Sequence, residues 1–192
     1  MKGKNVLKVA ITGNIASGKS QVERILNNKG FKVFDADAIA HKILDELTDF
    51  YGQDIFTNGK TDRKKLANVV FNNTDLKLKL EAIIHPKVKN EILKIFNDNQ
   101  HENVIFVSVP LLFEANFSKM FDKIIFISCP EELRLQRLIK RNDLSPDEAK
   151  KRINAQMPEM SKILKSDFVI ENKYTINELK QRVEEICDKL YL

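Results

Sequence analysis

Short runs of β-branched and aromatic residues recur along the chain, and segments with the periodicity of amphipathic helices lie between most of them. Five of these runs predict strands: 7–12, 31–34, 104–109, 123–128 and 168–170. Two runs, Val104–Val107 and Ile124–Ile127, are apolar at every position. Such continuity is typical of strands covered on both faces. The pattern therefore favours an α/β fold with a doubly wound parallel sheet and crossover helices.

The alternation of strands and helices stops between the second and third predicted strands. From Ala36 to Gln100 the apolar residues follow a helical period, before and after the dipeptide His85-Pro86. We interpret residues 38–100 as a helical insertion into the sheet-forming domain.

A second polar, helical stretch runs from Ser145 to Lys165, before the last predicted strand. It opens with Ser145-Pro146-Asp147-Glu148, which predicts an N-cap serine followed by proline at the first helical position. Residues 143–166 are therefore a candidate lid.

Composition limits the number of domains and the class of protein. A chain of 192 residues with 43% hydrophobic and 31% charged residues suits one globular domain with appendages, spanning residues 1–192. The two cysteines, Cys129 and Cys187, lie far apart, which argues against a disulfide framework. The N-terminus lacks the pattern of a signal peptide, and charges interrupt every apolar run. We expect a cytoplasmic protein without a membrane partner.

The net charge of +5 suits anionic partners, such as nucleotides, acidic cofactors or nucleic acid, without choosing among them. The basic clusters Arg63-Lys64-Lys65 and Lys151-Arg152 lack interleaved aromatic residues on which bases could stack. We interpret them as solvated faces and expect no nucleic-acid partner.

The first predicted strand leads into Gly13-Asn14-Ile15-Ala16-Ser17-Gly18-Lys19-Ser20, which matches the P-loop pattern. Its backbone amides and a following helix N-terminus can converge on phosphate oxygens. Lys19 would neutralise charge on the β- and γ-phosphates, and the Ser20 hydroxyl would complete a Mg²⁺ shell. The alternative is a glycine turn that binds nothing, against which the Gly-Lys-Ser offset argues. The loop alone does not separate kinases from GTPases, ATPases or nucleotide-sensing switches.

Two carboxylates follow the second predicted strand, in Asp35-Ala36-Asp37. We expect this strand to end adjacent to the P-loop, with both carboxylates at the edge where open α/β sheets bind ligands. Asp37 could accept the proton of a substrate hydroxyl while a γ-phosphoryl group moves toward it. The alternative is that these aspartates only cap the next helix, which is plausible for Asp35 and open for Asp37.

The strand at 104–109 ends in Pro110, without the aspartate that many P-loop motors and GTPases use for Mg²⁺. A base-reading Asn-Lys-x-Asp motif is also missing, although Asn172-Lys173 matches its first half. These observations favour a small-molecule kinase over a switch.

Three arginines, Arg134, Arg137 and Arg141, share roughly one face of a predicted helix and could bind transferring phosphates. The alternative is a solvated basic face. The histidines lack metal-ligand spacing, so zinc is not expected, and His85 fits a local structural role better than acid–base catalysis.

Taken together, the sequence resembles the dephospho-CoA kinase family over nearly its whole length. The resemblance is carried by Ile11-Thr12-Gly13, Ser17-Gly18-Lys19-Ser20, Phe34-Asp35-Ala36-Asp37, the run from Gly59 to Leu66, Val70-Phe71, Ile84-His85-Pro86, Val109-Pro110-Leu111-Leu112-Phe113-Glu114, Arg137-Leu138, Arg141, Arg152-Ile153, Ala155-Gln156-Met157 and the run from Ser166 to Asn172. The Val-Pro-Leu-Leu-Phe-Glu run and the Ala-Gln-Met element are the most specific of these.

The resemblance implies a P-loop NTPase-type three-layer fold with a five-stranded parallel sheet, a CoA-binding insertion and a mobile lid. It also implies transfer of the ATP γ-phosphoryl group to the 3′-hydroxyl of dephospho-CoA, with Mg²⁺. By position, Asp37 would be the base, Lys19 and Arg141 would stabilise the phosphoryl group, Arg137 would order the lid side, and His85 would lie near the substrate.

The sequence departs from the family where Asn14 and Asp143 replace usual glycines; asparagine tolerates left-handed backbone angles, which would accommodate Asn14. Two other functions remain as alternatives. One is a P-loop kinase acting on a nucleoside monophosphate or a small alcohol, and the other is a nucleotide-binding regulator. Acceptor-dependent release of ADP would separate an enzyme from a regulator.

Overall fold

The computed structural model describes residues 6–46, 56–57, 60–62, 65–66, 73–173 and 175–191. The chain divides into two compact units, one formed by Met1–Phe34 and Asn99–Leu192 and the other by Asp35–Asp98. Part of the motif run from Gly59 to Leu66, and all of Val70-Phe71, lie outside the described residues.

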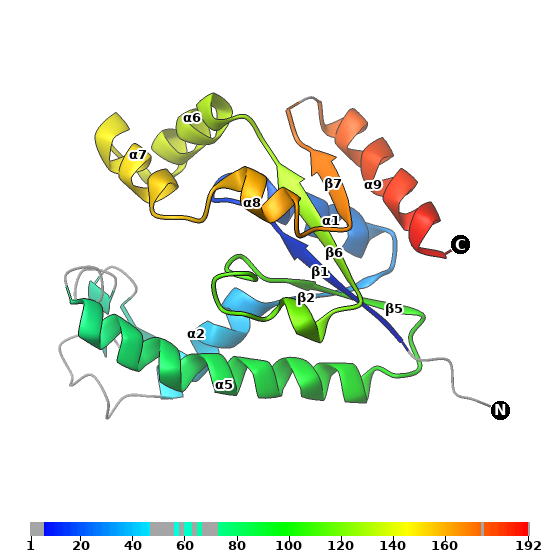
Figure 1. The fold of residues 1–192 in the computed structure, drawn as a ribbon, viewed down its shortest axis with the longest axis horizontal. Coiled ribbons are helices and arrows are strands. Elements are labelled where there is room, and N and C mark those ends of the chain that lie inside the picture. Colours follow the sequence, from blue (N-terminus) through cyan, green and yellow to red (C-terminus); the bar gives the residue numbers. More distant parts are fainter. Residues whose placement is uncertain are drawn as a thin grey trace. The chain divides into compact units, whose positions relative to one another are not determined.

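A five-stranded sheet forms the centre of the first unit (Figure 1). Its strands are β1 (Leu7–Thr12), β2 (Lys32–Asp35), β5 (Val104–Ser108), β6 (Lys123–Ser128) and β7 (Phe168–Glu171). β1 pairs in parallel with β5 and β6, and β6 pairs in parallel with β7. The predicted α/β fold with a parallel sheet is confirmed.

The order of the strands is β2-β5-β1-β6-β7, so β5 lies between β2, the strand before Asp35, and β1, the strand before the P-loop. Burial explains the order. All five residues of β5 are buried, which requires neighbours on both sides, whereas β2 has exposed residues at both ends and lies at the edge.

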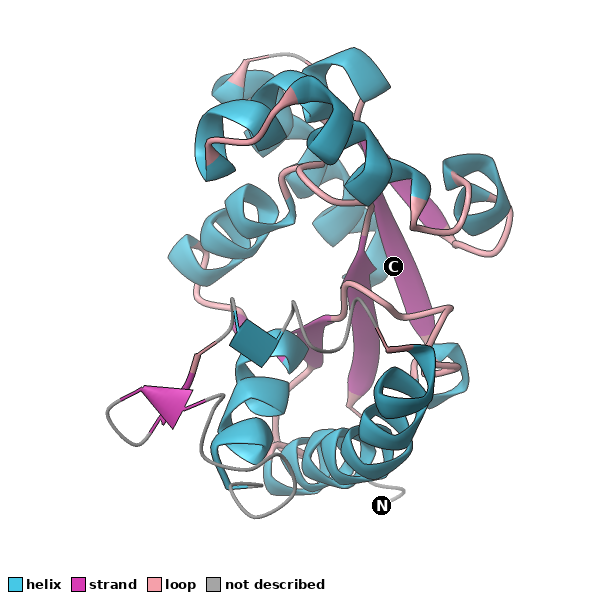
Figure 2. Cartoon of the chain, turned by 90° about the vertical axis from the view of Figure 1, so that its left-hand side faces the viewer, coloured by secondary structure: helices cyan, strands magenta, loops and turns pink. Residues whose placement is uncertain are grey.

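One face of the sheet packs against helices α1 (Lys19–Asn28) and α9 (Ile176–Tyr191). Apolar side chains of the strands, including Val9, Ile11 and Phe106, form one buried cluster with residues of both helices. In Figure 1, α1 lies behind the sheet and α8 (Glu159–Ile163) passes in front of it, in contact with β6. Figure 2 shows helices on both sides of the strands.

The predicted lid contains two short helices, α7 (Pro146–Asn154) and α8. α7 begins at the predicted residue: the Ser145 hydroxyl accepts from the backbone of Glu148, whose carboxylate accepts from the Ser145 N–H. The Ser145 hydroxyl also donates to this carboxylate at 2.7 Å, and this bond, together with the one from the Ser145 N–H, lowers the pKa of Glu148. α7 packs against α6 (Glu131–Asn142) through a small core centred on Leu138.

The second unit contains α2 (Ala36–Glu46) and α5 (Thr74–Asp98), which pack against each other. α5 runs through Pro86 as one helix of 25 residues. The unit also holds an antiparallel pair, β3 (Phe56–Thr57) and β4 (Lys60–Thr61), where we expected helices alone. The Asn-Gly dipeptide between these strands is a hairpin signal. Our prediction gave more weight to the helical periodicity of the sequence around it.

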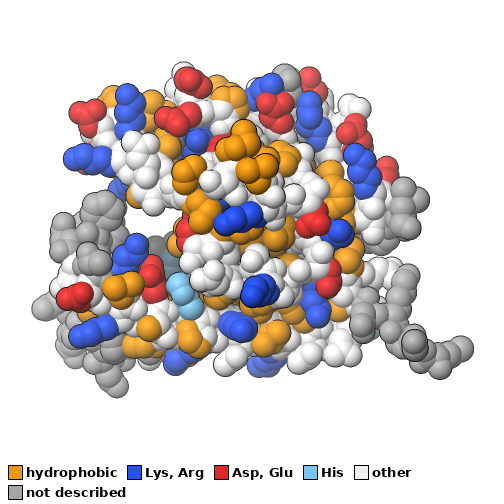
Figure 3. All heavy atoms as spheres, viewed as in Figure 1, with side chains coloured by type: hydrophobic (Ala, Val, Ile, Leu, Met, Phe, Trp, Pro, Cys, Tyr) orange, Lys and Arg blue, Asp and Glu red, His pale blue; other side chains and the backbone are white. Residues whose placement is uncertain are grey.

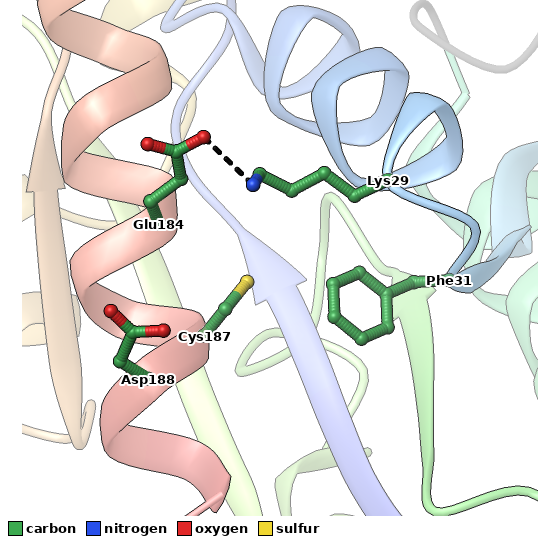
Figure 4. Close-up of a pocket in the computed structure, with 5 residues that line it drawn as sticks. All are labelled: Lys29, Phe31, Glu184, Cys187 and Asp188. Carbon is green, nitrogen blue, oxygen red and sulfur yellow. Dashed lines mark ion pairs between the residues drawn. The ribbon is translucent and has the colours of Figure 1, made fainter.

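A small hollow opens where the end of α1 meets α9 (Figure 4). Lys29 forms an ion pair with Glu184 at 2.7 Å beside Phe31 and the buried Cys187. Burial raises the pKa of the Cys187 thiol, which keeps it neutral. The hollow lies at the opposite end of α1 from the P-loop. We therefore conclude that the ion pair between Lys29 and Glu184 helps α9 pack against the end of α1.

An ion pair inside the first unit joins α8 to the segment that follows β5. The ammonium of Lys162 lies 2.6 Å from a carboxylate oxygen of Glu114. Lys162 has 0% exposed surface, whereas the Glu114 side chain is 26% exposed. The two charges therefore differ in their access to water, and the ammonium depends on its partner more than the carboxylate does.

Replacing each member of this pair with methionine tests the asymmetry. Glu114→Met leaves a buried ammonium without its carboxylate, and we expect the free energy of unfolding to fall by about 3 kcal/mol. Lys162→Met leaves a carboxylate that water already reaches, and the loss should stay below about 1 kcal/mol. Urea denaturation measures both values. Equal losses, or a larger loss in Lys162→Met, would contradict the assignment.

Candidate functional site

The loop from Gly13 to Ser20 joins the carboxyl end of β1 to the first turn of α1. A turn inside it is closed by the Ser17 N–H, which donates to the Asn14 carbonyl at 3.1 Å. Ala16 and Gly18 have φ values of 60° and 97°, in the left-handed region. Asn14 is not among the described residues with positive φ, so its accommodation does not depend on the backbone tolerance that we invoked.

Two glycines of the loop are required by close contacts with the protein itself. A Cβ on Gly13 would lie 2.6 Å from the carbonyl oxygen of Ile127 in β6, and one on Gly18 would lie 2.0 Å from Nδ2 of Asn172. Real Cβ atoms do not approach that closely, so the loop at Gly13, and either the loop or the Asn172 side chain at Gly18, would have to shift. The glycines thus let the loop lie against the carboxyl ends of β6 and β7.

The first turn of α1 is suited to an anion. Its N-cap is Gly18, and no acidic residue stands in the turn, so no carboxylate competes for the positive end of the helix dipole. Lys19 adds a charge, and its ammonium donates to the Gly13 carbonyl at 3.2 Å, across the loop. Ser20 is exposed at the same turn.

Two polar atoms in the loop are buried without a hydrogen-bond partner among the described residues, Oδ1 of Asn14 and Oγ of Ser17. Such atoms are rare in folded proteins and are commonly satisfied by a ligand or by water. The Ser17 hydroxyl can donate to an anion and accept from a donor. The Ser17 hydroxyl is therefore a candidate donor to the phosphate tail of a nucleotide, whereas Oδ1 of Asn14 can only accept a hydrogen bond.

Arg137 of α6 reaches the loop from outside. Its guanidinium lies 3.5 Å from the carbonyl oxygens of Ala16 and Asn172, and it donates to Sγ of Cys129 at 3.2 Å. Burial raises the pKa of the Cys129 thiol, although the nearby arginines oppose this, so the sulfur is a neutral acceptor. The positive charge of Arg137 is therefore not neutralised by the sulfur.

The loop between α7 and α8 also reaches the P-loop, through Gln156. Oε1 of Gln156 accepts from the backbone N–H of Ile15 at 2.7 Å. This bond joins residues 141 positions apart in the chain. It connects the predicted lid directly to the loop that we expect to hold phosphates.

The other arginines of α6 lie differently. Arg134 is buried, donates to the Cys129 carbonyl at 3.0 Å and lies 3.4 Å from the carboxylate of Glu159. These contacts give Arg134 a structural role, so the three arginines do not act as one phosphate-facing group. Arg141 is exposed and donates to the side chain of Asn142 at 2.9 Å.

The predicted acceptor-side residues belong to the second unit. Asp35 caps α2, because its Oδ1 accepts from the N–H of Asp37 at 2.9 Å. The Asp37 side chain is exposed in the first turn of α2. His85 is half-buried within α5. The capping alternative therefore holds for Asp35, and the role of Asp37 stays a prediction.

Sequence reasoning did not foresee that Gln156 and Asn172 bind the P-loop backbone. Nδ2 of Asn172 donates to the Ser17 carbonyl at 2.8 Å, from a position 155 residues away. Only the Asn-Lys dipeptide after the last predicted strand hinted at a polar group there, and it did not indicate which atoms it would contact.

Three further features concern possible metal clusters, membrane spans and the distribution of surface charge. Among the residues that the structure describes, no group of three or more His, Cys, Asp and Glu side chains could hold a metal ion. Within the same part of the chain, the helices are too short or too polar to cross a bilayer. On the face drawn in Figure 3, basic side chains are interspersed with acidic ones.

The sheet and the glycine loop between β1 and α1 define a nucleotide-binding protein of the P-loop kinase class. Shikimate kinase from Aquifex aeolicus, at 23% identity and a TM-score of 0.55, shares the fold. A family model described as dephospho-CoA kinase matches residues 7–178. The chain belongs to the dephospho-CoA kinase family.

Individual relatives agree with this assignment. A dephospho-CoA kinase from Fusobacterium nucleatum is 39% identical, with 97% of this chain and 100% of the relative covered. One from Carboxydothermus hydrogenoformans is 40% identical, with 94% and 93% covered. The solved dephospho-CoA kinase from Campylobacter jejuni is 35% identical at a TM-score of 0.72, with 95% and 96% covered. TT1252 from Thermus thermophilus reaches a TM-score of 0.83 at 31% identity, with 97% and 99% covered.

Gly18→Ala should disrupt nucleotide binding, because the new Cβ collides with Asn172 while the backbone is already left-handed. We expect the affinity for ATP, measured by titration calorimetry, to fall at least about tenfold, or roughly 1.4 kcal/mol. Gly30→Ala is the matched control: its φ is 87°, with no atom within 4 Å of the new Cβ. Equal ATP affinities in the two variants would contradict the prediction, because Gly30 lies beyond the other end of α1 from the loop.

Proposed function

We propose that the chain transfers the γ-phosphoryl group of ATP to the ribose 3′-hydroxyl of dephospho-CoA, which gives coenzyme A and ADP in the last step of coenzyme A synthesis. The match of the dephospho-CoA kinase family model to residues 7–178 carries this proposal. The glycine loop at the end of β1 also supports it. The close contacts of Gly13 with Ile127 and of Gly18 with Asn172 keep this loop in a shape that suits a phosphate tail. A bond forms between the 3′-oxygen and the γ-phosphorus, and the bond from that phosphorus to the β–γ bridging oxygen breaks.

At the donor side, we propose that residues 13–20 hold the triphosphate. Lys19 would move from the Gly13 carbonyl to the phosphate oxygens, where an ammonium lowers the free energy of the transferring group. Ser20 offers a hydroxyl oxygen, which fits Mg²⁺, and the bound ion would offset phosphate charge. Arg137 would add positive charge at the outer side of the loop.

At the acceptor side, we propose that Asp37 accepts the proton of the 3′-hydroxyl as the phosphoryl group arrives. Its exposed carboxylate, in the first turn of α2, supports this role. Asp35 caps α2 through its hydrogen bond with the Asp37 N–H, and Asp37 stands at the position that the family resemblance gives to the base. The insertion at residues 38–100, including His85, would bind the CoA part of the substrate.

Residues 143–166 would act as a lid that excludes water from the transfer. The exposed guanidinium of Arg141, just before this segment, would then stabilise the transferring phosphoryl group. The hydrogen bond from Ile15 to Gln156 supports a coupling between lid and P-loop.

The first test mixes the purified protein with ATP, Mg²⁺ and dephospho-CoA and follows coenzyme A and ADP by chromatography. We expect one ADP per coenzyme A formed. Parallel reactions with nucleoside monophosphates and shikimate as acceptors should stay at background. Turnover with one of these and none with dephospho-CoA would overturn the proposal in favour of another P-loop kinase, and ADP release independent of any acceptor would indicate a regulator.

Asp37→Asn should keep ATP affinity and lose transfer by about 10²- to 10⁴-fold, the usual contribution of a general base. Lys19→Ala should instead weaken ATP binding itself. Asp35→Asn is the matched control, because asparagine retains the oxygen that accepts from the Asp37 N–H and should leave kcat within about threefold. Single-turnover transfer and ATP titration together separate the effects. Near-normal transfer in Asp37→Asn would remove Asp37 as the base.

A further inference from the structure

The residue after β7, Asn172, is held firmly and is only 3% exposed. Its backbone N–H donates to the carbonyl of Ser128 at 2.8 Å, which continues the pairing of β7 with β6. The position of its side chain is therefore set by the sheet and not by the P-loop.

The side-chain amide of Asn172 uses its N–H groups on the P-loop and on α1. Nδ2 donates to the Ser17 carbonyl at 2.8 Å and to Oε1 of Gln21 at 3.3 Å. A carboxamide nitrogen has two hydrogens, so both bonds can be made at once. Gln21 thereby helps orient the amide that binds the loop.

The bond to Ser17 determines where the next backbone N–H points. The Ser17 carbonyl and the Gly18 N–H belong to one planar trans peptide unit, in which the two groups point in opposite directions. Because Asn172 holds the carbonyl on its own side, the Gly18 N–H is directed away from Asn172. Glycine at φ 97° would otherwise permit this peptide to rotate at little cost.

Asn172 and Gly18 also lie so close together that a side chain at position 18 would meet the Asn172 amide. A Cβ on Gly18 would lie 2.0 Å from Nδ2 of Asn172, so a larger residue there would displace the amide from its present position beside Ser17. The contact that brings Asn172 close to Gly18 is therefore also the contact that orients the Ser17–Gly18 peptide.

We propose that Asn172 is a positioning residue for phosphate binding: its side-chain amide fixes the Ser17–Gly18 peptide so that the Gly18 N–H points at the nucleotide phosphates. This inference rests on the proposed function, in which residues 13–20 bind ATP. It assigns Asn172 to the phosphate tail, through the backbone, and not to the adenine base.

The test compares two ligands that share phosphates but not a base, ATP and tripolyphosphate. Asn172→Ala removes the donor, and Asn172→Asp keeps the shape but places a carboxylate oxygen against the Ser17 carbonyl. Loss of one buried hydrogen bond predicts a fall in affinity of about tenfold. We expect that fall for both ligands and by the same factor, with the KM for dephospho-CoA unchanged. A loss confined to ATP would assign Asn172 to the base and overturn the proposal.

A matched control separates positioning from stability. Thr175→Ala removes the N-cap of α9, where the hydroxyl bonds Glu178 at 2.8 Å, and should lower the unfolding midpoint without changing tripolyphosphate affinity. If Asn172→Ala lowers the midpoint as Thr175→Ala does, with tripolyphosphate affinity also unchanged, then Asn172 is only structural and the proposal is wrong.

A measurement on the unaltered protein covers the case in which neither Asn172 variant folds. The proton resonance of the Gly18 N–H should move downfield when tripolyphosphate binds, and a Gly18 resonance that stays in place while ligand binds would overturn the proposal. Wild-type turnover with ATP and dephospho-CoA is measured first. If it is absent, the proposed function fails, whereas normal turnover with unchanged affinities in the Asn172 variants refutes only the positioning role.

Discussion

The shape of the glycine loop depends on its contact with the carboxyl ends of β6 and β7. Gly13 lies against the Ile127 carbonyl, and Gly18 lies against the Asn172 amide, closer than any side chain would allow. This contact determines which backbone groups of the loop are used by the protein and which remain for a ligand. The sheet order, with β1 between β5 and β6, brings β6 beside the loop.

Contacts from three other segments converge on this loop. Arg137 approaches from α6, Gln156 from the segment between α7 and α8, and Asn172 from the end of β7. Each binds a different backbone group of residues 15–17. Because backbone geometry in such a loop decides where its N–H groups point, these three distant residues help to set the shape of the loop.

Much of the fold follows from local pattern. β1 and β6 begin and end at the predicted residues, because the apolar and β-branched residues that predict each strand lie within a single segment. The capping box at Ser145 is equally local, with both partners within three residues. The order of the strands has no such local signal, because pairing depends on burial of whole strands. The β3–β4 pair was missed because two-residue strands carry little periodicity.

The amino-acid sequence by itself determined the class of the fold, the phosphate loop and the family, since glycine spacing, a lysine and apolar periodicity are properties of neighbouring residues. Only the tertiary structure decided that Asp35 is a cap and Arg134 an internal partner. It also decided that Asn172 holds the Ser17 carbonyl across 155 positions. Hydrogen bonds between such distant residues leave no periodic signal, because the folding of the sheet alone brings their atoms together.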